Sequence, residues 1–359
     1  MTSKTPRFTR RRVSFLDAFE EVSKGVRKFK QKEYLTKGKY PIIDQGKNLI
    51  AGYSNEMNGL YKDVPAIVFG DHTRCLKYIN EPFFVGADGV KILKPCLSEN
   101  VRYWFHVLQA TPIENLGYSR HFKLLKGKTF ILLNEEEQFE VCRVLDSVLT
   151  LISQENAIIF KLDNLVKSRF VEMFKVKHYE KLQLSEIGEL QSGGTPNRSC
   201  MGYFEGDIDW YSAGELNQFK LVGSREKITS KAIKESSAKL FPAGSLLIGM
   251  YDTAALKMGS IEKPSSSNQA CACFIPNVDM ELVWLFYEID FLKPKLLAQR
   301  NGCRQKNLNL RFIKSIEVEF PPLSLQQEFA DFVHQVDKLK FDLGICLFIL
   351  KEGIFRLSG

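Results

Sequence analysis

The feature that most constrains the fold is that this chain of 359 residues repeats itself. The segment FLDAFEEVSKG (15–25) is echoed by LSEIGELQSGG (184–194), and IVFGDHTRCLK (67–77) is echoed by LIGMYDTAALK (247–257). In the second pair, Thr73, Leu76 and Lys77 match Thr253, Leu256 and Lys257 at a constant offset of 180. These matches predict that one structural unit occurs twice.

Two further matches follow in the same order along the chain. GYSRHF (117–122) parallels GCRQKN (302–307), with Arg120 opposite Arg304, and EEEQFEVCRVLDSV (135–148) parallels LQQEFADFVHQVDKL (325–339), with Phe139 opposite Phe329. Chance matches would not keep a common order, so we interpret the repeat as a duplication.

Each copy begins with short β-like runs and ends in a long helical stretch. Runs such as AIVFG, KTFILL, SLLIGM and CACFIP are separated by Gly, Pro and Asn, which is typical of strands joined by turns. The first long stretch, 134–175, contains no Pro or Gly and begins at Asn134, a good N-cap residue. Apolar residues three and four apart on both stretches predict helices that pair as an antiparallel coiled coil.

The fold predicted is therefore mixed α/β (α+β), with two globular domains alternating with two spacer helices. The globular domains are expected at 7–133 and 176–322, and the helices at 134–175 and 323–359. The residues expected on the paired seam are Phe139, Leu145, Ile152, Leu162 and Phe170 in the first helix, and Phe329, Val336, Leu343 and Leu350 in the second.

Composition limits the environment and the partners. An excess of 50 Lys and Arg over 42 Asp and Glu leaves a net charge of +8, which mildly favours a polyanionic partner. The eight cysteines include no C-x-x-C pair, so we expect buried thiols, Cys271 and Cys273 among them, and no zinc or disulfide framework. Without a secretory signal or a long apolar run, the chain is expected to be cytoplasmic and to have no membrane contact.

Motifs for catalysis are absent from the sequence. There is no G-x-x-x-x-G-K-S/T loop for ATP, no N/D-P-P-Y/F motif of an amino-methyltransferase and no carboxylate cluster with a lysine that would indicate a nuclease. His72 and His121 have no partner at a metal-binding or catalytic spacing. We therefore expect a binding protein that is not an enzyme and holds neither metal nor cofactor.

Four segments resemble one family. VEFPPLSLQQEF (318–329) is similar to the boundary between the last strand and the conserved helix in type I restriction-modification specificity subunits. KSRFVEMF (167–174) resembles the end of their central helix, and LSEIGELQSGGTP with IDWYSAGEL resembles the opening of their target recognition domains. The resemblance covers essentially the whole chain, and the first copy departs from it where ILLNEEEQF has no Pro-Pro.

The resemblance implies a subunit that recognises double-stranded DNA. Each target recognition domain would read one half of a bipartite target, while the helices set the unread gap and dock two methyltransferase (modification) subunits. Restriction/translocase subunits would join through these, and S-adenosylmethionine and ATP would bind to the partners. Three alternatives stay open. They are a coiled-coil scaffold that binds only proteins, a specificity module of a related defence or methylation system without a type I nuclease, and an enzyme with nuclease or methyltransferase activity of its own, against which the missing motifs count.

The candidate DNA-binding residues lie in matching loops of the two copies. The resemblance implies that SGGTP opens a DNA-facing loop, and the same residues also fit an ordinary glycine turn. Arg, Asn and Gln side chains in polar loops suit contacts to base edges, and lysines at strand ends suit contacts to phosphates. The alternative for these polar side chains is simple exposure to solvent. The candidates are Lys24, Lys77, Arg120 and His121 in the first copy, and Ser192, Gly193, Gly194, Thr195, Arg198, Lys257, Arg300, Arg304, Gln305, Lys306 and Asn307 in the second.

The three tryptophans are assigned to packing. Trp104 and Trp284 lie in apolar helical segments and are expected in the core, and for Trp210 packing is favoured over stacking on a base. The basic run 10–12 suits either a phosphate contact or a solvated tail.

Overall fold

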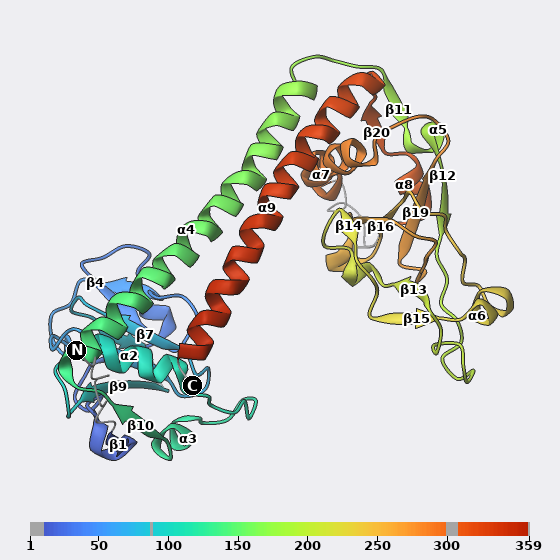
Figure 1. The fold of residues 1–359 in the computed structure, drawn as a ribbon. Helices are drawn as coiled ribbons and strands as arrows, with labels where there is room; N and C mark the ends of the chain where they lie inside the picture. Colours follow the sequence, from blue (N-terminus) through green and yellow to red (C-terminus); the bar gives the residue numbers. More distant parts are fainter. Residues whose placement is uncertain (1–10, 87–88, 299–307, 358–359) are drawn as a thin grey trace, which may run out of the picture. The chain divides into compact units, whose positions relative to one another are not determined.

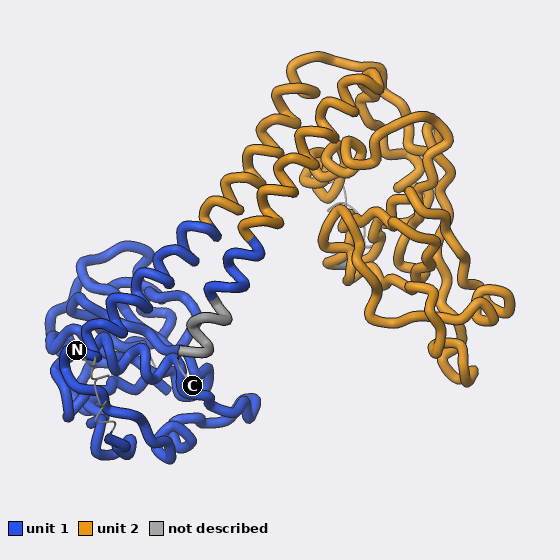
Figure 2. Tube along the Cα trace, viewed as in Figure 1, with its two compact units in different colours: residues 1–156, 344–359 blue, residues 157–343 orange. Residues whose placement is uncertain are grey.

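The structure is a computed structural model, which describes residues 11–86, 89–298 and 308–357 (Figure 1). The chain forms two compact units (Figure 2). Unit 1 comprises residues 1–156 together with 344–359, and unit 2 comprises residues 157–343. Unit 1 is thus discontinuous in sequence, because the end of the chain belongs to it.

Unit 1 contains two four-stranded sheets and a two-stranded ribbon. The sheet orders are β2-β9-β6-β7 and β3-β8-β4-β5, and the ribbon pairs β1 with β10. Its elements are β1 (Arg11–Ser14), α1 (Phe15–Ala18), β2 (Phe19–Glu21), β3 (Lys28–Phe29), η1 (Gln31–Glu33), β4 (Tyr40–Ile43), β5 (Gly52–Ser54), β6 (Ala66–Gly70), β7 (Leu76–Ile79), β8 (Phe84–Gly86), β9 (Val90–Pro95), α2 (Val101–Ala110), α3 (Phe122–Lys126), β10 (Thr129–Leu132) and the first part of α4 (Glu135–Phe174).

Unit 2 has the same kind of construction. Its sheets have the orders β12-β19-β16-β17-β14 and β15-β13-β18, and its ribbon pairs β11 with β20. The elements are β11 (Lys181–Gln183), α5 (Leu184–Ile187), β12 (Gly188–Ser192), β13 (Ile208–Tyr211), η2 (Ala213–Glu215), β14 (Lys220–Leu221), β15 (Glu226–Ile228), α6 (Ser230–Glu235), β16 (Ser245–Gly249), η3 (Asp252–Ala254), β17 (Met258–Ile261), β18 (Ser266–Ser267), β19 (Cys271–Pro276), α7 (Leu282–Ala298), α8 (Leu310–Lys314), β20 (Glu317–Glu319) and most of α9 (Leu323–Leu357).

The two topologies match strand for strand, which bears out the duplication. The order β2-β9-β6-β7 corresponds to β12-β19-β16-β17, and all of these neighbours are antiparallel. In the smaller sheets, β8-β4-β5 corresponds to β18-β13-β15, with one parallel and one antiparallel pairing in each. Strands β3 and β14 are additions to one copy each.

The hairpin register corrects the sequence match at Lys77. In β6 and β7, Phe69 pairs with Leu76, while in β16 and β17 Ile248 pairs with Met258. Lys77 therefore corresponds to Gly259, and the predicted match to Lys257 is wrong by two residues. The hairpin loop of the second copy is longer, and this insertion shifts the register.

Two more backbone contacts locate equivalent positions. The His121 N–H donates to the Asp71 carbonyl at 2.8 Å, and the Leu308 N–H donates to the Met250 carbonyl at the same distance. His121 thus occupies the place of a leucine, and the pairing of Arg120 with Arg304 was three residues out of register.

The two long helices have nearly the predicted extents. Helix α4 begins directly after Asn134, whose side chain accepts a hydrogen bond from the Glu137 N–H at 2.9 Å. Within unit 2 the two helices run antiparallel, because Asp163 pairs with Lys340 at 3.0 Å and Arg169 pairs with Glu328 at 3.0 Å. Phe329 packs against Phe170 and Phe174 at this seam.

Eight of the nine predicted seam residues are shielded. Phe170, Phe329 and Val336 are buried, and the partly buried members are Leu145, Ile152, Leu162, Leu343 and Leu350. Phe139 is 59% exposed, so its assignment to the seam is wrong. The buried residue at the start of α4 is its neighbour Gln138.

A buried glutamine begins each long helix and explains the error at Phe139. The Gln138 amide donates to the Leu133 carbonyl at 2.8 Å, and the Gln326 amide donates to the Pro321 carbonyl at 2.9 Å, five residues back in both cases. Gln138 is therefore equivalent to Gln326, and the match of Phe139 to Phe329 is two residues out of register.

The core confirms the assignments of two tryptophans and of Cys142, Cys271 and Cys273, whereas the prediction of a buried thiol is wrong for Cys96 and Cys346, which are exposed. Trp104 and Trp284 are fully buried. Cys271 and Cys273 share one face of β19 and are buried, and burial raises the pKa of each thiol to about 12. Neutral thiols in an apolar cluster behave as small hydrophobic residues.

Candidate nucleic-acid interface

The loop that begins at SGGTP is held by the protein's own backbone. The Gly193 N–H donates to the Cys271 carbonyl at 3.0 Å, and the Gly194 N–H donates to the Ser267 carbonyl at 2.9 Å. A Cβ atom on either glycine would overlap a carbonyl oxygen, that of Asn268 or Ser237. The glycines allow close approach of protein backbone, and their N–H groups are not free to bind phosphate in this structure.

The neighbouring hydroxyl groups are also engaged. The Ser192 hydroxyl donates to the Gln269 carbonyl at 3.3 Å, and the Thr195 hydroxyl donates to the Gln269 side chain. This loop therefore has a structural role, and nothing in the structure supports a DNA contact for Ser192 or Thr195.

Arg198 and Trp210 form one packed unit just beyond that loop. Arg198 makes a bidentate ion pair with Glu226 at 2.7 and 2.8 Å and lies over the rings of Phe204 and Trp210. Trp210 is buried and donates its indole N–H to the Gly194 carbonyl at 3.0 Å, which confirms packing over base stacking. Arg198 would have to leave Glu226 to bind a phosphate.

In unit 1, His121 anchors a loop and is not available to DNA. It is fully buried; its Nδ1 lies 3.0 Å from the Asp71 carbonyl, and its Nε2 accepts from the Leu116 N–H at 3.1 Å. The base-reading prediction for His121 is therefore wrong, because both ring nitrogens hold the loop in place. Arg74 also fastens this loop by donating to the Ile113 carbonyl at 2.9 Å.

The anchored loop presents the side chains beside His121. Arg120 is exposed, and Tyr118 is 93% exposed and stacks on His72 with ring centroids 5.1 Å apart. Arg120 thus stays a candidate for base or phosphate contact, and Tyr118 offers an aromatic face beside it.

The two strand-end lysines differ. Lys77 is buried, and its ammonium group donates to the Asp44 carbonyl at 2.7 Å and lies 3.3 Å from the Asp44 carboxylate. Burial lowers the pKa of Lys77, although Asp44 opposes this. Lys77 therefore cannot be the predicted phosphate contact, whereas Lys257 is half-buried and bonds Asn217 at 3.3 Å.

Part of the predicted interface falls beyond what the structure describes. Arg300, Arg304, Gln305, Lys306 and Asn307 lie outside the described residues, as does Arg10. Arg11 and Arg12 are exposed on β1. Lys24 is exposed on the turn after β2.

The sequence predictions missed a basic segment next to Lys24. Residues 24–39 contain seven Lys or Arg and a single acid, Glu33. All six lysines are exposed: Lys24, Lys28, Lys30, Lys32, Lys37 and Lys39. A count of charge along the chain would have found it, because runs of one sign mark polyanion-binding surfaces.

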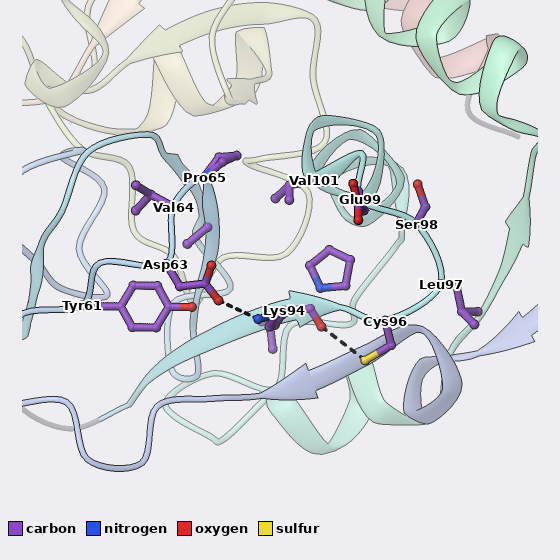
Figure 3. A pocket seen from close by; sticks show the side chains of 13 residues that line it. Tyr61, Asp63, Val64, Pro65, Lys94, Cys96, Leu97, Ser98, Glu99 and Val101 are labelled. Carbon is purple, nitrogen blue, oxygen red and sulfur yellow. Dashed lines mark hydrogen bonds and ion pairs between the residues drawn. The ribbon is translucent and has the colours of Figure 1, made fainter.

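A hollow of about 470 Å³ lies elsewhere in unit 1, between the end of β9 and the start of α2 (Figure 3). Lys94 and Asp63 form an ion pair of 2.7 Å within it. None of the predicted DNA-binding residues lines this hollow.

Neither a metal cluster nor a membrane span is found among the described residues. No group of three or more His, Cys, Asp or Glu could hold a metal ion in the part of the chain that the structure describes. Among those same residues, no helix is both long and apolar enough to cross a bilayer.

Comparison with known proteins shows what the chain is similar to. Residues 177–344 match the domain described as "Type I restriction modification DNA specificity domain". The EcoR124I/EcoR124II specificity subunit of Escherichia coli is 26% identical over 333 residues, which cover 86% of this chain and 82% of that protein. The MjaIX specificity subunit of Methanocaldococcus jannaschii is 27% identical over 175 residues, which cover 45% of this chain and 39% of that protein.

Solved structures agree in fold. The S subunit of a type I restriction-modification system from M. genitalium superimposes with a TM-score of 0.60 at 13% identity, covering 99% of this chain and 97% of that one. A chain from a structure of type I complex assembly gives 0.58 at 13% identity, covering 99% and 98%. Residues 177–344 of this chain thus match a type I restriction modification DNA specificity domain, and over most of its length the chain is similar to type I restriction enzyme specificity subunits and shares their fold.

Proposed function

We propose that this chain is the DNA-recognition subunit of a type I restriction-modification complex, with unit 1 and unit 2 each reading one half of a bipartite target. The repeated topology carries the proposal. Two units with one strand order but different loops suit two half-sites of different sequence, since the frame presents the loops and the loops select the bases.

The division into recognition domains and spacer helices belongs to this proposal. The recognition domains correspond to about 7–133 and 176–322, and the spacer helices to 134–175 and 323–359. The chain contributes binding, and methyltransferase subunits supply the adenine methylation with S-adenosylmethionine. Restriction subunits that use ATP join through them.

The outer faces of the long helices suit the methyltransferase subunits. Phe160 on α4 is 66% exposed and Phe341 on α9 is 68% exposed, and both lie near the level of the Asp163–Lys340 ion pair in unit 2. Large exposed aromatic side chains on a rigid helix pair are typical anchors of protein interfaces. We assign this aromatic pair to a contact with one of two methyltransferase subunits.

A map of modified bases in genomic DNA tests the proposal. Cells that carry this gene with its methyltransferase partner should contain methyladenine at one split sequence, and cells that lack this gene should not. Replacing residues 176–322 by the same region of a relative should change only one half of that sequence.

Other outcomes point to the alternatives. If methylation is unchanged by deletion and the assembled complex binds DNA without sequence preference, the chain is a protein-binding scaffold. If the split sequence is methylated but no cleavage activity accompanies it, the chain serves a methylation system without a type I nuclease.

A further inference from the structure

Segment 24–39 of unit 1 carries a strong excess of positive charge. Residues 24–39 carry seven basic side chains against one acid, whereas the whole chain has a net charge of +8. The segment therefore has a net charge of +6.

The lysines of this segment are free to bind an external anion. Arg27 pairs with Glu56. Among the described residues, by contrast, no carboxylate lies within ion-pair distance of the six lysines. Lysines with no carboxylate partner on one surface create a positive potential that an anionic ligand can neutralise.

The segment is also fixed to the sheet and is not a loose tail. Phe29 is buried against Phe84 with ring centroids 5.0 Å apart, so its neighbours Lys28 and Lys30 point away from the core. The Leu35 N–H donates to the Tyr53 carbonyl at 3.0 Å, and the Tyr53 N–H donates back at 2.9 Å.

A close contact fixes the second lysine group. Lys37 and Lys39 flank Gly38, where an added Cβ would lie 2.9 Å from the Tyr53 Cβ. The Lys39 N–H donates to the Asn55 side chain at 2.9 Å. The backbone that carries these two lysines is thus pressed against β5.

The lysines lie along both edges of the sheet β3-β8-β4-β5. Lys28 belongs to β3 at one edge, and the residues before β4 lie beside β5 at the other. At about 4.8 Å between strands, the two groups are roughly 15–20 Å apart. Since the major groove is about 12 Å wide, such a pair of groups can reach phosphates on both of its sides.

Unit 2 has no equivalent surface in the corresponding place. The segment between β12 and β13 contains one basic residue, Arg198, and two acids, Glu205 and Asp207. Arg198 is already paired with Glu226. The corresponding segments of the two units therefore differ in charge, although the units share a topology.

We propose that the lysines of segment 24–39 form a phosphate-binding surface of unit 1. This inference rests on the proposed function and deepens it. The surface supplies affinity that is independent of sequence, and the choice of bases lies in other residues.

Binding of labelled DNA to the complex of this chain with its methyltransferase subunits tests the inference. The probes are a duplex with the mapped target and a duplex with that target scrambled. Changing Lys28, Lys30 and Lys32 together to Gln should weaken binding of both duplexes by the same factor. A plot of the logarithm of the binding constant against the logarithm of the salt concentration has a negative slope, and its magnitude should decrease by about 2–3 in the variant. Each phosphate that the variant no longer neutralises contributes about 0.9 to this decrease.

Two control variants separate charge from structure. Changing the same lysines to Arg should preserve the salt slope. Changing Lys161, Lys167 and Lys338, which are exposed on the long helices, to Gln should also leave the slope unchanged. A slope that does not fall in the first variant, or falls equally in the helix variant, overturns the inference.

Failure of the inference can be told from failure of the function. If the unmodified complex does not prefer the target duplex over the scrambled one, the recognition function fails. If that preference is present but the triple Gln variant loses only target binding, the recognition function stands and the lysines are base readers, which contradicts the proposed surface.

Discussion

Gln326 is a single buried side chain on which the start of α9 depends. Its amide donates to the Pro321 carbonyl, and its oxygen accepts from the Glu281 N–H at 3.0 Å. Gln326→Ala would leave both backbone groups unpaired in the core, so the free energy of unfolding should fall by about 2–3 kcal/mol. Denaturant unfolding of the purified chain measures this. The exposed neighbour supplies the control, since Gln327→Ala should change the free energy by less than about 0.5 kcal/mol.

Glu288 should make the stability depend on pH. It is buried, with the Lys175 ammonium 2.6 Å from its carboxylate, and burial raises its pKa although Lys175 opposes this. A carboxyl group whose pKa rises on folding holds its proton more tightly in the folded state. Its contribution to stability should therefore fall as pH rises from 4.5 through the raised pKa.

Unfolding free energies measured across that pH range test the assignment to Glu288. Glu288→Gln cannot ionise, so it should flatten this part of the curve, while Glu317→Gln, at an exposed site nearby, should preserve it. An unchanged curve in Glu288→Gln would mean that another group titrates.

At the same scale, sequence predicted residue types better than residue roles. The buried tryptophans and cysteines follow from apolar neighbours along the chain. The role of Gly194 does not, because the Ser237 carbonyl that excludes a side chain there lies more than forty residues away in sequence. His121 is polar and follows Arg120, so the sequence alone suggests a surface position. Its structural equivalence to Leu308 of unit 2 shows that it belongs to the core.

In the pair of long helices, buried and exposed aromatic residues should differ in their effect on stability. Phe329 is buried and contacts Phe170, Phe174 and Tyr287. Phe329→Ala should lower the free energy of unfolding by about 3–5 kcal/mol, as expected for removal of a buried ring. Phe341→Ala, at an exposed position of the same helix, should change it by less than about 0.5 kcal/mol.

The exposed position should instead matter for assembly. Phe341→Ser should leave thermal unfolding of the chain unchanged and weaken its association with methyltransferase subunits, as measured by titration calorimetry. The control is Val171→Ser, which replaces another exposed apolar residue, on α4, by serine. Equal losses of affinity in both variants would argue against a specific contact at Phe341.

Helices could be predicted from the sequence where apolar residues recur at a regular spacing over many residues. The spacing of apolar residues located both helices to within two residues, since a seam must repeat every three or four positions. Matches across loops failed, as at Lys77 and Phe139. Inserted residues change the offset between the two copies, and the flanking sequence does not show where the insertion lies. Hydrogen-bond register was needed to correct them.

For the whole molecule, the helix pair should set the unread gap of the target. Adding one heptad to both α4 and α9 lengthens each helix by about 10.5 Å, and it preserves the seam because the repeat is kept. At about 3.4 Å per base pair, the gap should grow by about three base pairs while both half-sites stay the same. Methylation mapping checks this, and a change in the bases of either half-site would contradict the assignment of the helices as spacers.

Unit 1 is discontinuous, and this affects how the chain is made. Its sheets are translated before unit 2, but residues 344–359, with the buried Leu347, are translated after all of unit 2. On the ribosome, unit 1 therefore cannot be completed until unit 2 has been synthesised. A premature stop shortly before residue 344 would therefore damage the part of the protein that had been made first.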